Sequence, residues 1–296
     1  MTASGSELRE PGTLTSPSNA GDAGSRAIVI RPTRGWVRFG LGDLLAYREL
    51  LLFLIWRDIK VRYKQTALGV AWAVIQPVLA MLIFSVFFGK LAGVPSDNVP
   101  YPVFALTGLL PWQLFSYALT QSSNSVVANK NLVTKVYFPR LVVPLSATLS
   151  GLLDFAISFA VLLLMLGYYR IPLTPALFAV PLVVLFAVLS ALAVGLWFSA
   201  LNVRYRDVQF TIPFLTQFWL FATPIAYPSS LVPPRWRALY GLNPMAGVVE
   251  SFRWALLGRP PASPGLIAVS MGIVVLGLVG GLAFFQRVER SFADLV

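Results

Sequence analysis

Long stretches without a charged side chain are the feature that most constrains how this chain can fold. Five of them contain no Asp, Glu, Lys or Arg, and a sixth contains only Asp154. A helix needs about 20 largely apolar residues to cross the hydrocarbon core of a bilayer. Trimmed at Pro, Gly and polar clusters, the stretches predict an all-α integral membrane protein with six spanning helices, near 66–89, 103–127, 142–168, 176–201, 209–228 and 264–286.

The composition agrees with this class. The 296 residues are 57% hydrophobic and only 12% charged, whereas soluble domains are roughly 25% charged. A net charge of +11 is explained by the Lys and Arg that gather at the cytoplasmic ends of spanning helices, so no nucleic-acid partner is expected. The chain has neither Cys nor His, which excludes disulfides, His or Cys metal ligands, His general bases and Cys nucleophiles.

The loops predict an orientation. Most of the 23 Lys and Arg residues fall in segments that are cytoplasmic if the N-terminus is inside, so both termini are expected in the cytoplasm. Residues 1–40 are rich in Gly, Ser, Thr and Pro and lack the apolar core of a signal peptide. They are predicted to form a disordered cytoplasmic tail.

Residues 41–64, just before the first predicted span, read as a basic amphipathic helix. Within WRDIKVRYKQTALGVAW, five charged residues lie between Arg57 and Lys64, and the next charge is Lys90. Asp58 and Arg62 are four residues apart and are expected to pair. Such a helix suits the plane of the membrane surface. It is either an ordinary basic anchor or a lever that a partner pushes.

Two further cytoplasmic segments resemble docking surfaces. Residues 129–140, NKNLVTKVYFPR, mix cations with apolar side chains and stop at Pro139. A loop that only faces water does not need that apolar content, and a short amphipathic segment fits a groove on a soluble subunit. The alternative is that its apolar side chains dip into the membrane interface. Residues 202–208, NVRYRDV, are shorter, and their charges contact a partner or cap helix ends.

The segment 228–262, between the fifth and sixth predicted spans, is too apolar for a wet loop and too interrupted to cross the bilayer. Pro233 and Pro234 open one short predicted helix. Asn243 followed by Pro244 fits an N-cap and first helical residue of a second helix that runs to Gly258. The pair is read as re-entrant helices, with a hairpin lying flat on the outer surface as the alternative.

The predicted spans carry two sets of unusual residues. Span five carries an aromatic stripe with one amide beside it, formed by Phe210, Phe214, Gln217, Phe218 and Phe221. The stripe either packs against lipid and protein or lines a path along which sugars slide. Asp154 is an acid inside a span, and such a group normally faces protein or water. It is read as the structural partner of polar groups on another helix, with a proton site as the alternative.

The motifs WRDIKVRYKQTALGVAWAVIQP, NKNLVTKVYFPR, NVRYRDV, ATPIAYP and LNPMAGVVESFRWALLG, in this order, resemble the permease of type-2 ABC exporters for polysaccharides. That family moves lipid-linked O-antigen, capsular polysaccharide or teichoic acid, and the resemblance covers residues 44–290. It implies a six-span domain over 65–290 in the bacterial cytoplasmic membrane, a homodimer, two separate ABC ATPase subunits and a polyprenyl-linked glycan as substrate.

The resemblance also assigns roles to residues. Coupling to the ATPase is expected from the interface helix 41–64 and the two loops, through Arg57, Asp58, Lys60, Lys130, Lys135, Tyr137, Arg140 and Arg206. The outer gate is expected at Asn243, Pro244, Glu250 and Arg253, the last two of which are spaced to pair. No GxxxxGK[ST] motif occurs in this sequence. This subunit is therefore expected to be a permease, not an enzyme, and to bind no cofactor, with ATP and Mg²⁺ on the partner.

Two other functions stay open at this point. A proton-coupled lipid flippase would require Asp154 and a proton gradient but no ATPase. A membrane transferase acting on a polyprenyl carrier would need acidic or metal-binding clusters near a membrane surface, which the sequence does not display. A teichoic-acid exporter is a third possibility, within the same ABC family.

Overall fold

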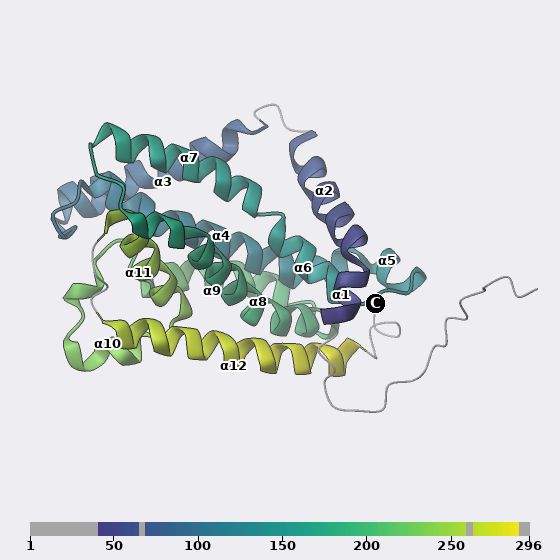
Figure 1. Cartoon of the computed structure of the whole chain (residues 1–296). Helices are drawn as coiled ribbons and strands as arrows, with labels where there is room; N and C mark the ends of the chain where they lie inside the picture. The colour runs from purple at the N-terminus through teal and green to yellow at the C-terminus, as the bar shows by residue number, and fades with distance from the viewer. Residues whose placement is uncertain (1–40, 65–68, 259–262, 290–296) are drawn as a thin grey trace, which may run out of the picture. The chain divides into compact units, whose positions relative to one another are not determined.

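The computed structural model describes residues 41–64, 69–258 and 263–289 (Figure 1). The predicted tail, residues 1–40, lies outside the described residues. All described residues belong to one compact unit, residues 39–296. Within these ranges the chain forms helices, turns and loops and no strand, so the predicted all-helical membrane fold is confirmed.

The helices follow one another along the chain with short connections. Their bounds are α1 Leu41–Ala46, α2 Arg48–Lys64, α3 Ala71–Phe84 with a π-helical continuation η1 Ser85–Leu91, α4 Tyr101–Ala128, α5 Lys130–Lys135, α6 Val142–Leu149, α7 Leu152–Tyr168, η2 Pro175–Ala179, α8 Val180–Arg204, α9 Val208–Ala222, η3 Ser229–Leu231, α10 Pro234–Tyr240, α11 Pro244–Leu257 and α12 Pro264–Glu289.

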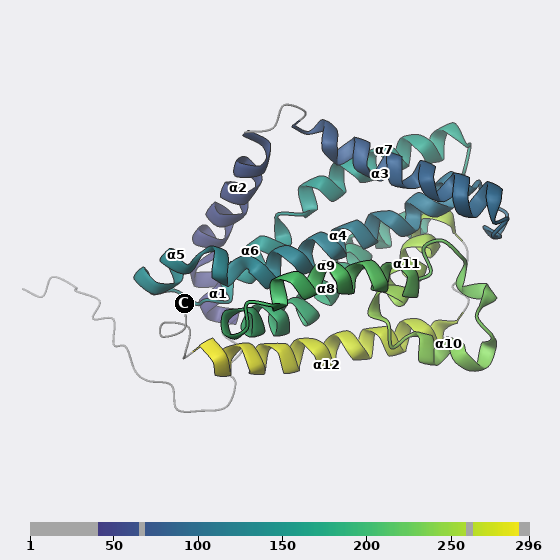
Figure 2. The same ribbon diagram turned by 180° about the vertical axis from the view of Figure 1, so that it is seen from behind.

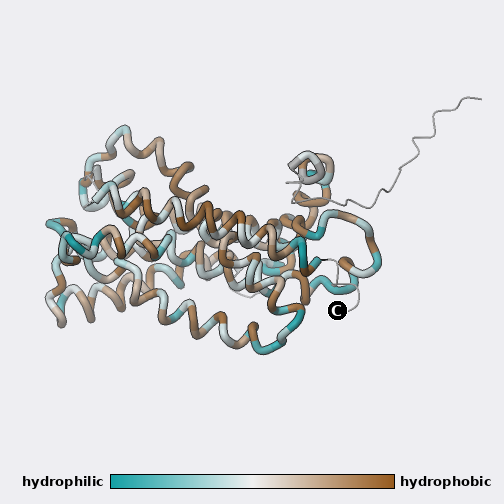
Figure 3. Tube along the Cα trace, turned by 90° about the horizontal axis from the view of Figure 1, so that it is seen from below, coloured by the Kyte–Doolittle hydropathy of each residue, from teal (hydrophilic) through white to brown (hydrophobic). Residues whose placement is uncertain are grey.

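Five helical segments of the described chain are long and apolar enough to cross a membrane: Ala71–Leu91, Tyr101–Ala128, Val142–Tyr168, Pro175–Arg204 and Pro264–Glu289. Figure 3 shows hydrophobic residues along most of their length and hydrophilic residues mainly in the turns. The remaining predicted span corresponds to α9, an apolar helix of 15 residues. At 1.5 Å per residue it is about 22 Å long, less than the roughly 30 Å hydrocarbon core. The count of six spans therefore stays a prediction.

The prediction that the fifth span reaches residue 228 is wrong for its last six residues. The helix ends at Ala222, and Thr223 is extended, with φ −101° and ψ 143°. Thr223 precedes Pro224, and the proline ring disfavours a helical conformation of the residue before it. The chain then forms turns up to Pro228.

The core of the bundle is built around α4. This helix packs against α3, α6, α7, α8 and α11, while α12 packs on α8 and α11 (Figure 2). Close approach between α4 and α8 depends on Gly195, where an added Cβ would lie 2.7 Å from the Ser122 hydroxyl. In contrast, only 17% of the α3 segment is buried, against 78% of α4. One face of α3 is thus left open to lipid or to another chain.

A second, smaller hydrophobic core lies at one end of the bundle, and we call it the end cluster. It joins α2, α4, α5, α6, α8 and α12 through buried apolar side chains: Leu54, Val126, Val133, Phe138, Val142, Val143, Leu196, Ala200, Val203 and Phe285. Because close-packed interiors transmit displacement, a force on α2 or α5 reaches several long helices.

Candidate functional site

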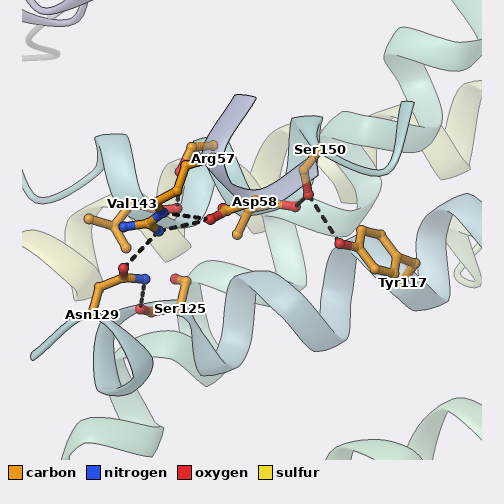
Figure 4. Close-up of polar contacts among 9 residues, drawn as sticks. Arg57, Asp58, Tyr117, Ser125, Asn129, Val143 and Ser150 are labelled. Atoms are coloured by element: carbon orange, nitrogen blue, oxygen red, sulfur yellow. Dashed lines mark hydrogen bonds and ion pairs between the residues drawn. The ribbon is translucent and has the colours of Figure 1, made fainter. Parts of the chain in front are cut away.

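Arg57 links two of the predicted coupling elements. Its guanidinium donates to the Asp58 carboxylate at 2.8 Å and to the Asn129 side-chain oxygen at 2.8 Å (Figure 4). Asn129 is the C-cap of α4, and its amide nitrogen donates back to the Ser125 carbonyl at 2.8 Å. The middle of α2 is therefore tied to the end of α4, one residue before α5 begins.

The local pairing expected between Asp58 and Arg62 is wrong. Asp58 accepts from its neighbour Arg57, and Arg62 instead forms an ion pair with Asp154. Four-residue spacing makes the local pair possible, but such a pair stabilises a helix by only about 0.2–0.5 kcal/mol. A local gain of this size is too small to hold Arg62 against the ion pair that it forms with Asp154.

The segment 129–140 forms a short helix, α5, followed by a turn. Its apolar side chains divide, because Val133 and Phe138 are buried in the end cluster while Tyr137 is 81% exposed. Lys130 and Lys135 are exposed as well. Arg140 points elsewhere and donates to the backbone carbonyl of Glu289 at the end of α12. The segment thus has one anchored face and one free basic and aromatic face.

The other predicted coupling residues differ in whether a partner protein could reach them. Lys60 on α2 and Arg206 between α8 and α9 are exposed. The α8–α9 turn lies at the same end of the bundle as α5 and the end of α12 (Figures 1 and 2). We call Lys60, Lys130, Lys135, Tyr137 and Arg206 the basic end. Arg57, Asp58 and Arg140 lie behind it and position its elements.

Asp154 is held by the last turn of α2. One carboxylate oxygen accepts from Arg62, and the other accepts from the Tyr63 hydroxyl. Arg62 also stacks over Tyr117 of α4, 4.1 Å from the ring centroid. Burial, and then the hydrogen bond to Asp154, raise the pKa of Tyr63 to about 12, so its hydroxyl remains a donor at physiological pH. Asp154 therefore has the polar partners on another helix that its predicted structural role requires, Arg62 and Tyr63. No local pattern in the sequence indicates which cation pairs with it.

The aromatic stripe of α9 faces outward from the subunit. Phe210 is 73% exposed and Phe221 59% exposed, and Phe214 and Phe218 between them contact each other with ring centroids 5.0 Å apart. Gln217 beside them is exposed as well. None of these side chains lies in the core of the described chain. The stripe is available for lipid or a second protein surface.

The helices predicted between α9 and α12 are present. Helix α10 begins at Pro234, and α11 begins at Pro244 with Asn243 as its N-cap, whose side chain accepts from the Met245 backbone N–H at 3.0 Å. Gly258 ends α11 in the left-handed conformation at φ 66°, which glycine adopts without penalty. Helix α11 packs against α4, α8 and α12, which favours a re-entrant helix over a hairpin lying on the surface.

Arg253 of α11 is the most deeply buried cation of the predicted outer gate. It is 7% exposed, lies 3.7 Å from the centroid of the Phe104 ring, and donates to the Ile225 carbonyl at 3.0 Å. Its expected pairing with Glu250 is confirmed at 3.8 Å. A buried cation needs such compensation because desolvation of an unpaired charge is costly.

Side chains from distant elements close the end of α9. The Ala222 carbonyl accepts from Tyr240 at 2.7 Å and from Asn243 at 3.0 Å, and the Ala226 carbonyl accepts from Tyr101 at 2.6 Å. The Ala222 carbonyl is one that the end of α9 leaves free. The Ala226 carbonyl and the Ile225 carbonyl, which accepts from Arg253, lie in the turn that follows the helix. We call Tyr101, Tyr240, Asn243 and Arg253 the capping cage. The sequence pointed to Asn243 and Arg253 but not to either tyrosine.

Comparison with known proteins shows the family to which this chain belongs. The ABC-2 type transporter family matches residues 49–257. The chain is 31% identical to the O-antigen export system permease protein RfbA of Klebsiella pneumoniae over 88% of this chain and 98% of that protein. It is likewise 31% identical to RfbA of Myxococcus xanthus, over 86% and 98%. The polysialic acid transport protein KpsM of Escherichia coli is 28% identical over 81% and 93%.

The match begins at the second residue of α2 and ends with α11, and so includes most of the interface helix, the segment 129–140 and the capping cage. The chain belongs to the ABC-2 type transporter family.

Proposed function

We propose that this chain is the membrane subunit of an ATP-driven exporter that moves a lipid-linked polysaccharide across the bacterial cytoplasmic membrane. The observation that carries the proposal is its likeness to O-antigen export permeases over 98% of their length. Two copies of the chain would assemble with two separate ABC ATPase subunits, which would bind ATP and Mg²⁺.

The basic end is the surface on which the ATPase would act. Its exposed cations and Tyr137 suit a partner with acidic and apolar groups, since complementary charge steers association and fixes its register. Motion of the ATPase would reach the long helices by two routes. One is the hydrogen bond between Arg57 and Asn129, and the other is the apolar packing of the end cluster.

The path of the glycan would run between the two copies. The outward face of α9 offers aromatic rings, which contact the apolar faces of sugars without holding them by many hydrogen bonds, and conduction needs binding weak enough to release. On the outer side, α10 and α11 would form the gate. The capping cage joins this gate to the end of α9, so that the two would move together.

The geometry around Asp154 argues against a proton-coupled flippase. Both carboxylate oxygens are engaged, one by Arg62 and the other by Tyr63. A proton carrier must exchange protons with a pathway, whereas both oxygens of this carboxylate already accept hydrogen bonds from neighbouring side chains.

The test is a clean deletion of the gene followed by complementation with a tagged chain. We expect surface polysaccharide to disappear in the deletion strain and to return on complementation, and we expect an ABC ATPase to co-purify with the tagged chain. Replacing Lys135 by Glu should weaken that association, whereas replacing the exposed Lys90 at the other end of α3 should not. Unchanged surface polysaccharide in the deletion strain would overturn the proposal.

A further inference from the structure

A groove of about 610 Å³ opens between α3, α4 and α7, next to the last turn of α2. Its volume falls within the roughly 300–1,000 Å³ of small-molecule sites. It is separate from the outward face of α9, because none of the stripe residues lines it. It is also separate from the basic end, none of whose residues contributes to its wall.

The chemistry of the groove changes along its length. Near α2 the wall holds Arg62, Asp154, Gln121 and Tyr117, and farther along it holds Phe84, Leu110 and Leu220. Helices α3 and α4 pack side by side, and the polar and apolar parts lie about three helical turns apart on α4, or roughly 16 Å at 5.4 Å per turn. The groove therefore suits a molecule with a polar group at one end and an apolar group at the other.

The polar part is rich in hydrogen-bonding groups but carries no net charge. Arg62 is neutralised by Asp154, so the pair lacks the excess positive charge that recognises a phosphate. The amides of Gln76, Gln113 and Gln121 also line the groove, and none forms a hydrogen bond to another residue within 41–64, 69–258 and 263–289. One guanidinium nitrogen of Arg62, Nη2, is buried without a hydrogen-bond partner there.

Aromatic rings complete this wall. Trp72 on α3 and Tyr117 on α4 line the groove on facing helices, and Trp72 is 50% exposed. Flat rings pack against the C–H faces of pyranose sugars, while free amides and a charge-neutral ion pair both donate to and accept from hydroxyl groups. Phosphate and simple acyl chains each match only part of this lining.

We propose that the groove binds a sugar residue of the exported glycan near its lipid anchor, with Trp72 and Tyr117 stacking on the ring and Gln113 and Gln121 bonding its hydroxyls. Arg62 and Asp154 present the remaining polar atoms, and the lipid anchor begins in the apolar part beside Leu110. The inference rests on the proposed export function. Each subunit would then carry its own site for the glycan and would also form half of the path between the two copies.

The test uses the absence of native cysteine in the chain. Single-cysteine variants Gln121→Cys and Lys90→Cys, each in complex with the ATPase, are labelled with a water-soluble maleimide in ATP-depleted membranes. The membranes come from cells that make the glycan and from cells that lack its first glycosyltransferase. Lys90 is exposed on η1 and does not line the groove. We expect labelling at position 121 to slow about tenfold when the glycan is present, with no change at position 90; a tenfold effect corresponds to about 1.4 kcal/mol of binding free energy.

Equal labelling in both membranes, or equal protection of both positions, would overturn the inference. A second measurement compares Trp72→Ala with Phe178→Ala, because both aromatic side chains are at least half exposed and only Trp72 lines the groove. We expect export to fall severalfold for Trp72→Ala, to recover for Trp72→Phe, and to be unaffected for Phe178→Ala. Export by Trp72→Ala at the wild-type rate would also count against the site. If deletion of the chain leaves surface glycan unchanged, the proposed function fails; if export depends on the chain but labelling does not respond, only the groove assignment fails.

Discussion

Arg57 occupies the point where α2 meets the end of α4. It bridges Asp58 and Asn129, and a hydrogen bond to a charged group contributes about 1.5–3 kcal/mol when it is shielded from water. Here the Arg57 side chain is 35% exposed, so the stabilisation lies at or below the lower end of that range. Its role is to fix the position of α2 relative to α5 more than to stabilise the fold.

Replacing Asn129 by Ala removes the acceptor on α4 and leaves Arg57 paired with Asp58. We expect ATP hydrolysis by the purified complex to persist while export per ATP falls severalfold, because α2 and α4 are no longer tied. Parallel assays of phosphate release and of surface glycan measure this ratio. Asn131→Ala, an exposed position two residues away on α5, is the matched control. Wild-type export per ATP in Asn129→Ala would contradict the role of the link.

Asp154 and Arg62 form a pair that is about a third exposed at each side chain. Asp154→Asn leaves Arg62 without its counter-charge, and we expect it to destabilise the protein by about 1–2 kcal/mol. The double variant Arg62→Gln with Asp154→Asn should recover part of that loss, since no charge is then left unpaired. Thermal unfolding in detergent tests both variants. If instead Asp154→Asn is as stable as the wild type and export stops when the proton gradient is dissipated with ATP present, Asp154 is a proton site.

At the scale of elements, α9 and α11 show why local sequence predicts some helix ends and misses others. Both ends of α11 follow from adjacent residues, because Asn243, Pro244 and Gly258 supply an N-cap, a first helical residue and a left-handed C-terminus. The end of α9 and the turn after it are held also by side chains of α4, α10 and α11, which donate to the carbonyls of Ala226, Ala222 and Ile225. A run of apolar residues through ATPIAYP does not reveal such donors.

The same distinction applies to the candidate site. The exposed cations and Tyr137 of the basic end could be predicted, because each lies in a short basic segment that can be recognised from its own residues. The bond from Arg57 to Asn129 and the pair between Arg62 and Asp154 could not, since each joins residues more than 70 positions apart. An acid within a span indicates that some partner exists, but only packing selects which cation it is.

The ion pair between Arg253 of the capping cage and Glu250 gives a prediction for α11. Arg253→Met leaves the buried Glu250 without its counter-charge and removes the donor to the Ile225 carbonyl, and breaking a buried pair in this way costs about 3–5 kcal/mol. We expect a marked loss of thermal stability, partly restored by adding Glu250→Gln. Arg235→Met on α10, where the arginine is exposed, should change stability by less than about 0.5 kcal/mol. A single Arg253→Met variant as stable as Arg235→Met would show that the cage is not needed.

At the scale of the whole molecule, α3 and α9 each present a largely unpartnered apolar surface. The basic end connects to both through α4, because the end cluster ties α2 and α5 to α4 and both α3 and α9 pack on α4. A subunit built in this way is suited to transmit a push from one end to the faces that would meet a second copy in the proposed dimer.

A single cysteine on α9 tests whether two copies meet there. Phe218→Cys should form a covalent dimer with a short bismaleimide, because the aromatic stripe would line the space between the two copies. Leu164→Cys on α7 is the control, since Leu164 is exposed but lies outside that stripe. Cross-linking in membranes followed by denaturing electrophoresis gives the answer. Dimer formation from Leu164→Cys but not from Phe218→Cys would place the contact elsewhere.

The central claim is that a separate nucleotide-hydrolysing subunit drives transport through this chain. The most direct measurement is glycan transport into proteoliposomes that contain the purified chain, with or without the co-purified ATPase, and with ATP as the only source of energy. We predict transport only when both proteins and hydrolysable ATP are present, and loss of transport when Lys135 is replaced by Glu. Transport by the chain alone, or transport driven by a proton gradient without ATP, would contradict the account.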